Sequence, residues 1–395
     1  MKPRVRSPHP FPARMAPEVA METLDAEEID GTVLDPMCGS GTVLRAAAQR
    51  GLHAVGFDLD PLAVLMAEVW TTPIDQEVLI IEANRLVRQA ESLTATKVEL
   101  PWIDDDLETK QFISYWFAEP QRGHLRRIAL LLHQRSGPMA NALRLALSRL
   151  IITKDSGASL ARDVAHSRPH RTKHASSFDV FSEFSKSAGV IASRLDSASL
   201  LGSVDVKVGD SRRLTSVSDQ TIGLVLTSPP YLNAIDYMRG HRLSLVWLGH
   251  GLKELRRIRA ESIGSERGAD SDTISGINLV RDTAPDALSL PARFLSIFER
   301  FAIDISALVA EVSRVLIPQG RAVFVVGNSM VREVFLPNAN LVAAAAENAG
   351  LVVESRTERE LPSSHRYLPP PSQGTGSALG KRIRSETVLM CRRLL

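Results

Sequence analysis

The sequence predicts an α/β fold in which a doubly wound parallel sheet is interrupted by helical insertions. Residues 31–61 read as strand, glycine-rich turn, helix and strand, which is the pattern of a βαβ unit. The same alternation resumes after residue 202 and continues to about residue 390. The length of 395 residues, with 44% hydrophobic and 23% charged residues, is typical of a globular protein with one large or two modest domains.

The first βαβ unit begins with a short apolar run at residues 32–34. A turn with two glycines follows at 35–42, and residues 43–48 are rich in helix formers. Gly51 closes this helix, and residues 53–57 form a second strand. The crossover between two parallel strands is expected to be right-handed, which leaves a crevice at the carboxyl ends of the strands.

Strand signals fade between residues 76 and 201, where the composition becomes helical and polar. Residues 128–132 and 142–147 have the composition of helices, whereas 154–177 is a stretch rich in Ser, Arg and His with few apolar residues. We expect a helical insertion that carries a mobile basic loop.

One segment of this insertion is strongly positive. Between Gln121 and Ala175 there are eleven Lys and Arg residues against two acidic ones, a net charge of +9 in a chain whose total is +2. Such a local excess is typical of a surface that faces phosphate groups, and it favours contact with nucleic acid. The alternative is an ordinary solvated helical surface.

The α/β alternation returns with two buried strands that end in polar loops. Residues 204–208 lead to Asp210, and residues 222–226 lead to the loop at 227–231. A polar insertion at about 253–290 comes next. The remaining elements are expected to be a helix at 294–316, a strand at 321–326, a helix at 340–349, and strands at 351–355 and 386–390.

Composition and spacing argue against several classes of protein. The apolar runs fall far short of the roughly 18 residues of a membrane-spanning helix, and the N-terminus has no apolar leader segment. Cys38 and Cys391 are the only cysteines, with no Cys-x-x-Cys or Cys/His cluster, so neither a disulfide framework nor a zinc site is expected. A reducing cytoplasmic location is expected.

The turn at residues 35–42 has the features of a ligand-binding loop. Gly39 and Gly41 lack Cβ atoms, so they can adopt positive φ and let a ligand approach the backbone. Asp58 ends the next strand, where a carboxylate can accept hydrogen bonds from ribose hydroxyls. The turn lacks the Gly-x-x-x-x-Gly-Lys pattern of triphosphate sites, so a nucleoside without a pyrophosphate fits better. The alternative is a tight βα turn with no ligand.

A second loop, Ser228-Pro229-Pro230-Tyr231, follows the buried strand at 222–226. Two prolines fix φ and donate no N–H, so the loop is rigid and its carbonyls can accept hydrogen bonds. Rigid acceptors beside an aromatic face can hold a base and present its amino group to an electrophile. The alternative is a proline-rich strand exit with a packing tyrosine.

Together these motifs resemble those of S-adenosylmethionine-dependent DNA amino-methyltransferases, which modify cytosine N4 or adenine N6. The resemblance rests on the turn at 35–42, on Asp58 and on the loop at 228–231. Residues 9–14 are similar to the family element that closes over the methionine end of the cofactor. Asp210 matches the position that usually contacts the adenine amino group.

The resemblance implies a Rossmann-like methyltransferase sheet, S-adenosyl-L-methionine as cofactor and duplex DNA with a flipped base as substrate. It suggests a cognate restriction endonuclease as a partner, and neither a membrane nor a metal. The implied domains are a cofactor-binding catalytic part at 1–75, a basic insertion for target recognition at 76–201, and a second catalytic part at 202–395. The implied cofactor-binding residues are Phe11, Asp35, Pro36, Cys38, Gly39, Ser40, Gly41, Thr42, Asp58, Leu59 and Asp210.

The implied catalytic residues are Ser228, Pro229, Pro230 and Tyr231, and their chemistry supports this assignment. An exocyclic amine is a poor nucleophile because its lone pair is delocalised into the ring. If Ser228 and the Pro229 carbonyl accept its hydrogens, the nitrogen can pyramidalise and attack the methyl group while Tyr231 stacks on the base. No covalent intermediate is needed, and Cys38 is expected to be a small turn residue rather than a nucleophile.

Several alternatives stay open. Ser228 tilts the resemblance towards cytosine N4, but an RNA base methyltransferase or a catalytically idle DNA-binding or cofactor-sensing subunit would share parts of the pattern. The large insertion between Asp58 and Asp210 departs from familiar arrangements and puts any transfer of target specificity in doubt. Residues 233–237 and His241 either line the base pocket or begin a helix capped by Asn233 or Asp236.

Overall fold

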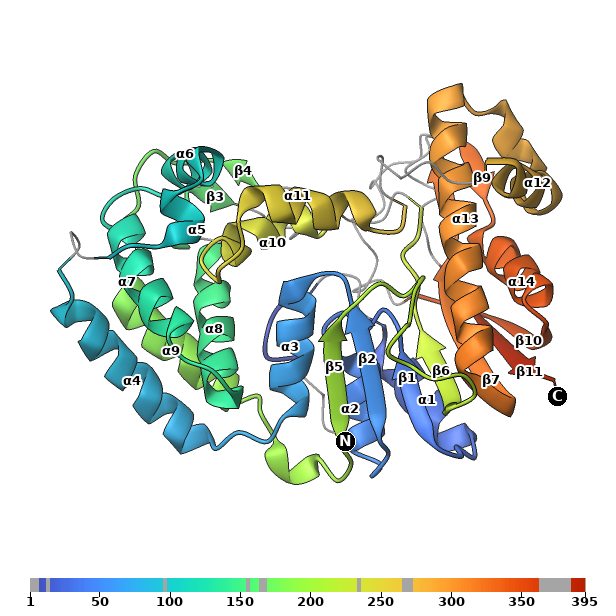
Figure 1. Cartoon of the computed structure of the whole chain (residues 1–395), viewed down its shortest axis with the longest axis horizontal. Helices are drawn as coiled ribbons and strands as arrows, with labels where there is room; N and C mark the ends of the chain where they lie inside the picture. Colours follow the sequence, from blue (N-terminus) through green and yellow to red (C-terminus); the bar gives the residue numbers. More distant parts are fainter. Residues whose placement is uncertain are drawn as a thin grey trace.

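The computed structural model describes residues 7–11, 15–94, 98–153, 157–162, 169–232, 236–264, 273–361 and 385–394. Their centre is a seven-stranded sheet with the order β10-β11-β7-β6-β1-β2-β5 (Figure 1). Its strands are β1 (Thr32–Asp35), β2 (Ala54–Asp58), β5 (Val204–Val208), β6 (Ile222–Thr227), β7 (Leu316–Gly327), β10 (Leu351–Glu360) and β11 (Ser385–Arg393).

The strand directions follow the doubly wound pattern that the sequence predicts. Strands β5, β2, β1, β6 and β7 are parallel, and β11 lies antiparallel between β7 and β10. The chain moves outward from β1 in both directions, first to β2 and later to β6. Because the strand order reverses there, the carboxyl ends of these three strands are where sheets of this type bind their ligands. The predicted α/β sheet is confirmed.

Helices cover both faces of the sheet. They include α1 (Pro17–Ala26) and α2 (Thr42–Ala48) on one side and α13 (Ala292–Val315) and α14 (Asn338–Asn348) on the other. Alternation along the strands explains this, because Leu224 and Leu226 pack with α1 and α2, whereas Val225 packs with α13 and α14. Strands buried on both faces are therefore continuously apolar, as the run at 222–226 is.

Helix α3 (Pro61–Thr71) lies between the sheet and the helical insertion and was not predicted. Asp60 caps it by accepting the N–H of Leu62 at 2.9 Å, and Pro61 occupies its first turn. Nine of its eleven residues are buried. A helix buried on nearly all sides has no polar face, so its sequence lacks the amphipathic period by which helices are recognised.

The predicted helical insertion at 76–201 forms a lobe beside the sheet (Figure 1). Its helices are α4 (Gln76–Ser92), α5 (Pro101–Asp104), α6 (Leu107–Trp116), α7 (Gln121–His133), α8 (Pro138–Ile151) and α9 (Val180–Ala192), followed by the short η2 (Ser197–Ser199). Their buried side chains form one apolar cluster that extends onto α3. The two stretches of predicted helical composition, 128–132 and 142–147, lie in α7 and α8.

The sequence predicted a loop for the basic stretch at 154–177, but the structure places two short strands in it. Strands β3 (Ala161–Arg162) and β4 (His170–Arg171) form a small antiparallel hairpin within it. The N–H of Leu160 donates to the Trp116 carbonyl at 2.8 Å, and the N–H of Thr172 donates to the Leu160 carbonyl at 3.1 Å. The first bond attaches the base of the hairpin to the end of α6, and the second joins its two sides, which composition alone could not indicate.

A second group of helices follows β6. It comprises α10 (Met238–Leu245), α11 (Leu252–Glu261), α12 (Thr273–Thr283) and η3 (Pro285–Ser289), and a hairpin of β8 (Ser329–Val331) and β9 (Val334–Leu336) follows β7. Figure 1 shows α10 and α11 above the carboxyl ends of the parallel strands. Their buried residues join the apolar cluster of the helical lobe, where Trp247 lies edge-on to Phe117. None of the helices in the described part of the chain is long and apolar enough to cross a membrane.

Candidate functional site

The glycine turn between β1 and α2 is closely packed on two sides. Gly39 and Gly41 have φ of +50° and +86°. A Cβ at Gly41 would lie 2.9 Å from the Cβ of Ala67, so a side chain there would separate α2 from α3. A Cβ at Gly39 would lie 3.0 Å from the ring of Phe11. The turn therefore needs glycine for its backbone conformation and for its packing.

Asp58, at the end of β2, shapes this turn directly. Its Oδ2 accepts the N–H of Gly39 at 2.9 Å, and its Oδ1 accepts the N–H of Asp60 at 2.9 Å. Burial and the neighbouring charge of Asp60 raise the pKa of Asp58 to about 6. Each carboxylate oxygen can accept more than one hydrogen bond, so these contacts leave acceptor capacity for hydroxyl groups of a ligand.

Asp35 joins the ends of the two neighbouring strands β1 and β6. Its Oδ1 accepts the hydroxyl of Thr227 at 2.8 Å and the N–H of Met37 at 3.2 Å. Only 4% of the residue is exposed, and burial raises the pKa of its carboxyl to about 7. Asp35 and the buried Pro36 thus sit beneath the crevice.

Two buried hydroxyls of the turn have no hydrogen-bond partner among the described residues. Ser40 Oγ and Thr42 Oγ1 lie where the turn enters α2. Both hydroxyls therefore have hydrogen-bonding capacity left for a group bound at the turn. Together with the carboxylate of Asp58, these hydroxyls form a set of polar groups that fits a nucleoside ligand.

An aromatic group covers the turn. The ring of Phe11 lies over Gly39 and stacks on Tyr237, with ring centroids 5.1 Å apart and an interplanar angle of 18°. Phe11 also lies 5.8 Å from the ring of His241. The N-terminal segment and α10, which are far apart in sequence, therefore meet above the glycine turn. Residues 12–14 of the predicted element lie outside the described residues.

Asp60 belongs to the same cluster and was not identified from the sequence. Its Oδ2 is hydrogen-bonded to Nδ1 of the buried His241. Burial alone would raise the pKa of Asp60, but the charge and hydrogen bond of His241 hold it below its usual range. The signal that could have found it is an Asp directly before Pro61, which is typical of a helix N-terminus.

Of the two alternatives for residues 233–237, a side-chain cap by Asp236 is not found at the helix that follows the Ser-Pro-Pro-Tyr loop. Helix α10 begins after Tyr237, without a side-chain cap. Asp236 instead pairs with Arg239 at 3.0 Å and Arg259 at 2.7 Å, which draws it towards α11. Asn233, the other predicted cap, lies outside the described residues.

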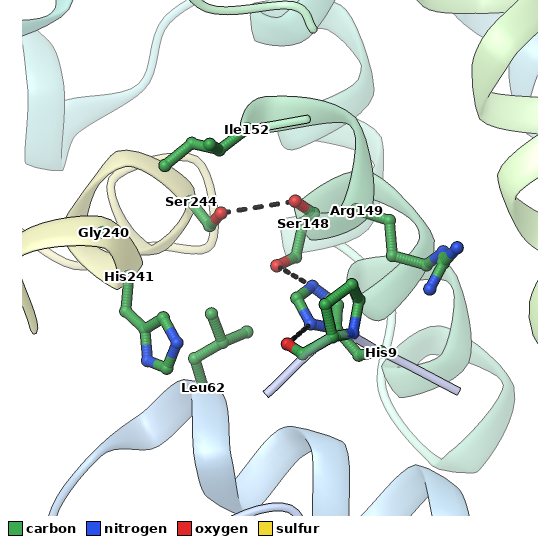
Figure 2. Close-up of a pocket in the computed structure, with 9 residues that line it drawn as sticks. His9, Leu62, Ser148, Arg149, Ile152, Gly240, His241 and Ser244 are labelled. Carbon is green, nitrogen blue, oxygen red and sulfur yellow. Dashed lines mark hydrogen bonds between the residues drawn. The ribbon is translucent and has the colours of Figure 1, made fainter. Parts of the chain in front are cut away.

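A small cavity of about 40 Å³ lies beside this cluster, between the N-terminal segment, α3, α8 and α10 (Figure 2). His9 Nε2 is hydrogen-bonded to Ser148 Oγ at 3.0 Å on one side, and Ser244 Oγ donates to the Ser148 carbonyl at 3.4 Å on the other. His241 and Leu62 line the wall below. A space of this size holds a few water molecules and not a nucleoside, so this cavity is not the candidate ligand site.

Asp210, predicted to contact an adenine amino group, follows the edge strand β5. Its carboxylate accepts hydrogen bonds from Nε of Arg212 at 2.9 Å and from Nη2 at 2.7 Å. Burial alone would raise the pKa of Asp210, but these hydrogen bonds hold it below its usual range. Arg212 also donates to Asp304 at 2.6 Å, so the carboxylate of Asp210 has a fixed orientation.

The Ser-Pro-Pro-Tyr loop is tied to β7. Ser228 Oγ donates its hydrogen to the Val325 carbonyl at 2.9 Å, and Pro229 is buried behind it. The hydroxyl of Tyr231 donates to Glu386 Oε1 at 3.0 Å. Since the Ser228 hydroxyl already uses its one hydrogen, its oxygen can act only as an acceptor towards a further group. The half-buried Pro230 completes this rigid loop.

The sheet brings the predicted residues together in one row. Adjacent strands β5, β2, β1 and β6 carry Asp210, Asp58, Asp35 and Ser228 at their carboxyl ends. At roughly 4.8 Å per strand, the backbones at Asp58 and Ser228 are about 10 Å apart. Leu59, next to Asp58, instead packs against the apolar cluster of the helical lobe.

The buried thiol of Cys38 fits a packing role. Burial raises the pKa of this thiol well above its usual value, and its sulfur lies against Gly56, where an added Cβ would approach it to 3.2 Å. A thiol of this kind is a poor nucleophile. Within the described residues, no group of three or more His, Cys, Asp or Glu side chains is arranged to hold a metal ion.

Comparison with known proteins places this chain beside methyltransferases. No family model matches the chain. Type II methyltransferase M.MvaI of Kocuria varians is 22% identical over 358 residues, which cover 83% of this chain and 78% of that protein. The chain is similar to Type II methyltransferases. The resemblance that the motifs predicted is therefore confirmed.

A second relative is Type II methyltransferase M.BsoBI of Geobacillus stearothermophilus, 23% identical over 267 residues. The match covers 58% of this chain and 49% of M.BsoBI, so the chain spans about half of that relative.

Two solved structures are similar at low TM-scores. A presumed DNA modification methylase of Thermus thermophilus, complexed with S-adenosyl-L-methionine, gives 0.26 at 20% identity and covers 48% of this chain and 54% of that chain. A SAM-dependent methyltransferase from Methanosarcina mazei gives 0.33 at 10% identity and covers 95% and 97%.

Proposed function

We propose that the protein is a DNA methyltransferase that transfers the methyl group of S-adenosyl-L-methionine to an exocyclic base amine, with cytosine N4 favoured over adenine N6. The observation that carries this proposal is the hydrogen bond from Ser228 to the Val325 carbonyl at 2.9 Å. It leaves the Ser228 oxygen as a pure acceptor on a rigid loop, beside the ring of Tyr231 and at the same edge of the sheet as Asp58. Similarity to Type II methyltransferases supports the same reaction class.

The cofactor would occupy the crevice above the glycine turn. Asp58 would accept the ribose hydroxyls, Asp210 the adenine amino group, and Phe11 would cover the turn from above. The orphaned hydroxyls of Ser40 and Thr42 offer further polar contacts. When bound, S-adenosyl-L-methionine supplies an electrophilic methyl group.

The substrate amine would be held by the loop at 228–231. Ser228 Oγ and the Pro229 carbonyl accept the two amine hydrogens, which localises the nitrogen lone pair. Tyr231 provides the aromatic surface for a base that has left the duplex. The loop holds the amine in a fixed orientation, because it is attached to β7 and its prolines restrict the backbone. A fixed orientation of the reacting groups lowers the barrier to methyl transfer.

The basic segment from Gln121 to Ala175 is the candidate DNA-binding surface. The excess of arginine between Gln121 and Ala175 and the hairpin of β3 and β4 support contact with phosphates. We retain the division into a catalytic part at 1–75 and 202–395 and a target-recognition insertion at 76–201 as part of the proposal.

Mass spectrometry of nucleosides from a host that expresses the protein tests the proposal. We expect N4-methylcytosine in the DNA, and its absence from a host that expresses the Ser228→Ala/Tyr231→Ala double variant at equal level. N6-methyladenine would correct the base, and a methylated ribonucleoside would favour the alternative RNA enzyme. Unmodified DNA and RNA together with measurable cofactor binding would favour an idle cofactor-sensing subunit.

A further inference from the structure

The hydroxyl of Tyr231 is held by a residue from the far end of the chain. It donates to Oε1 of Glu386 at 3.0 Å, and Glu386 lies near the start of β11, 155 positions further along the sequence. In the sheet, Glu386 is the register partner of Gly327, the last residue of β7. The antiparallel edge of the sheet therefore reaches the loop that carries the proposed catalytic residues.

Gly327 creates the space in which the ring of Tyr231 lies. A Cβ at Gly327 would be 2.6 Å from Cε2 and 2.7 Å from Cζ of Tyr231. No other amino acid fits there without moving the ring. The ring of Tyr231 therefore contacts the backbone of Gly327, and its hydroxyl is bonded to Glu386. These two contacts together restrain the orientation of the ring.

Glu386 is itself restrained. Its Oε2 lies 3.6 Å from Nη1 of Arg359, its partner across the β10–β11 hairpin. The two side chains are only 14% and 24% exposed. The contact with Arg359 is an ion pair without a hydrogen bond, so the hydrogen bond from Tyr231 is the directional contact that links the carboxylate to the loop. Holding a side chain in place from behind in this way is a common role of residues around a site.

We propose that Glu386 is a positioning residue that fixes the ring plane of Tyr231 for stacking against the substrate base. The proposal rests on the proposed function for the role of Tyr231 in stacking. The hydrogen bond and the packing on Gly327 carry the positioning itself. The C-terminal hairpin then contributes to the reaction without touching the substrate.

Fluorine NMR tests the positioning independently of any activity. The chain has four tyrosines, so protein labelled with 3-fluorotyrosine gives few signals, and Tyr231→Phe identifies the signal of Tyr231. We expect Glu386→Ala to shift or broaden that signal and Glu386→Gln, which keeps an acceptor oxygen, to leave it close to its original position. The control is Glu354→Ala, which removes ion pairs with Arg321 and Arg392 in the same hairpin.

Kinetics test the consequence for the reaction. We expect Glu386→Ala to lower kcat roughly 10- to 100-fold, as small displacements of a reacting group do, while the affinity for S-adenosyl-L-methionine stays unchanged. Tyr231→Phe should give a similar loss, and the double variant should be no worse than either single one, because both changes break one contact.

Each outcome decides the inference. An unchanged Tyr231 signal in Glu386→Ala, or additive losses in the double variant, overturns it. If Glu386→Ala fails to fold because Arg359 loses its partner, Tyr231→Phe alone decides, since full turnover in that variant also overturns the positioning role. A wild-type protein with no methyl transfer to any nucleic acid would refute the proposed function, whereas the NMR result would still report on the contact.

Discussion

The backbone N–H of Gly39 donates to Oδ2 of Asp58 at 2.9 Å, across the two neighbouring strands β1 and β2. The acid that is predicted to bind the ribose therefore also holds the turn over which the cofactor would lie. Because the pKa of Asp58 is raised to about 6, its protonation state changes within an accessible pH range. Cofactor binding and proton release are expected to be linked through this residue.

Binding of S-adenosyl-L-methionine should release a proton near pH 6. Ribose hydroxyls donate to the ionised carboxylate, so the bound ligand lowers the pKa of Asp58 and favours loss of its proton. The affinity should rise as the pH increases from 5 to 7 and then level off. Titration calorimetry in buffers with different ionisation enthalpies measures the proton count.

Two variants distinguish proton release by Asp58 from titration of Asp35, the other buried acid at this edge of the sheet. Asp58→Ala should bind the cofactor about 10- to 100-fold more weakly, as expected for loss of a hydrogen bond to a charged acceptor, and should release no proton. Asp35→Asn, whose side chain lies beneath the crevice, should keep the proton release. Equal affinity in a folded Asp58→Ala variant would remove Asp58 from the site.

Stability should fall as the pH rises through the range in which Asp35 titrates. Its pKa is about 7 in the folded protein, against 3.8 for an unperturbed aspartate, so the folded chain binds more protons than the unfolded chain between these values. The free energy of unfolding therefore decreases from about pH 4 to pH 7. Asp58, with its raised pKa, contributes in the same direction.

Asp35→Asn tests this dependence. Asn keeps the oxygen that accepts from Thr227 and Met37 but carries no charge, so thermal unfolding should show a flatter pH profile than the wild type, with the largest relative gain at pH 8. A pH profile parallel to that of the wild type would mean that Asp35 does not titrate in this range.

Replacement of Tyr231 should separate methyl transfer from cofactor binding. Tyr231→Ala removes a stacking surface worth about 1 to 3 kcal/mol per base, so kcat should fall while the affinity for S-adenosyl-L-methionine is nearly unchanged. Ser228→Ala should lower kcat less, because the Pro229 carbonyl remains. Normal turnover by Tyr231→Ala, measured with radiolabelled cofactor, would show that the loop has been assigned the wrong role.

The basic hairpin should contribute to DNA affinity through phosphates. Arg171 lies 4.8 Å from the ring centroid of Tyr115, which keeps its guanidinium on the surface of α6, and Arg162 is on the opposite strand. We expect combined replacement of Arg168, Arg171 and Lys173 by Ala to weaken DNA binding. The slope of log affinity against log salt should flatten by about two to three units. Arg168 lies outside the described residues.

The pattern of change in this variant identifies the kind of contact. An unchanged salt slope with an altered sequence preference would mean that these side chains read base edges. If neither the salt slope nor the sequence preference changed, the DNA-binding face would have to be sought on α11. Replacement of Lys253 and Arg257 by Ala is the corresponding variant there. Cofactor affinity should be unaffected in every case.

Local signals in the sequence determined the first βαβ unit, the glycine turn and the Ser-Pro-Pro-Tyr loop. Each depends on residues within a few positions: an apolar run ends, a glycine or proline follows, and the next element begins. The sequence also predicted that Asp58 and Ser228 lie at strand ends, because parallel strands align their carboxyl ends at one edge of the sheet. Such features follow from backbone conformational preferences, which are local.

The tertiary structure alone decided which distant residues meet. The contacts of Asp60 with His241 and of Tyr231 with Glu386 join residues 181 and 155 positions apart. The pattern of apolar and polar residues along the sequence does not indicate which residues pair over such distances. Helix α3 escaped prediction for a related reason, since burial on nearly all sides removes the polar face that marks a helix. The insertion of β11 between β7 and β10 likewise depends on strand pairing across the sheet. Local preferences select the elements, whereas the packing of complete surfaces selects their partners.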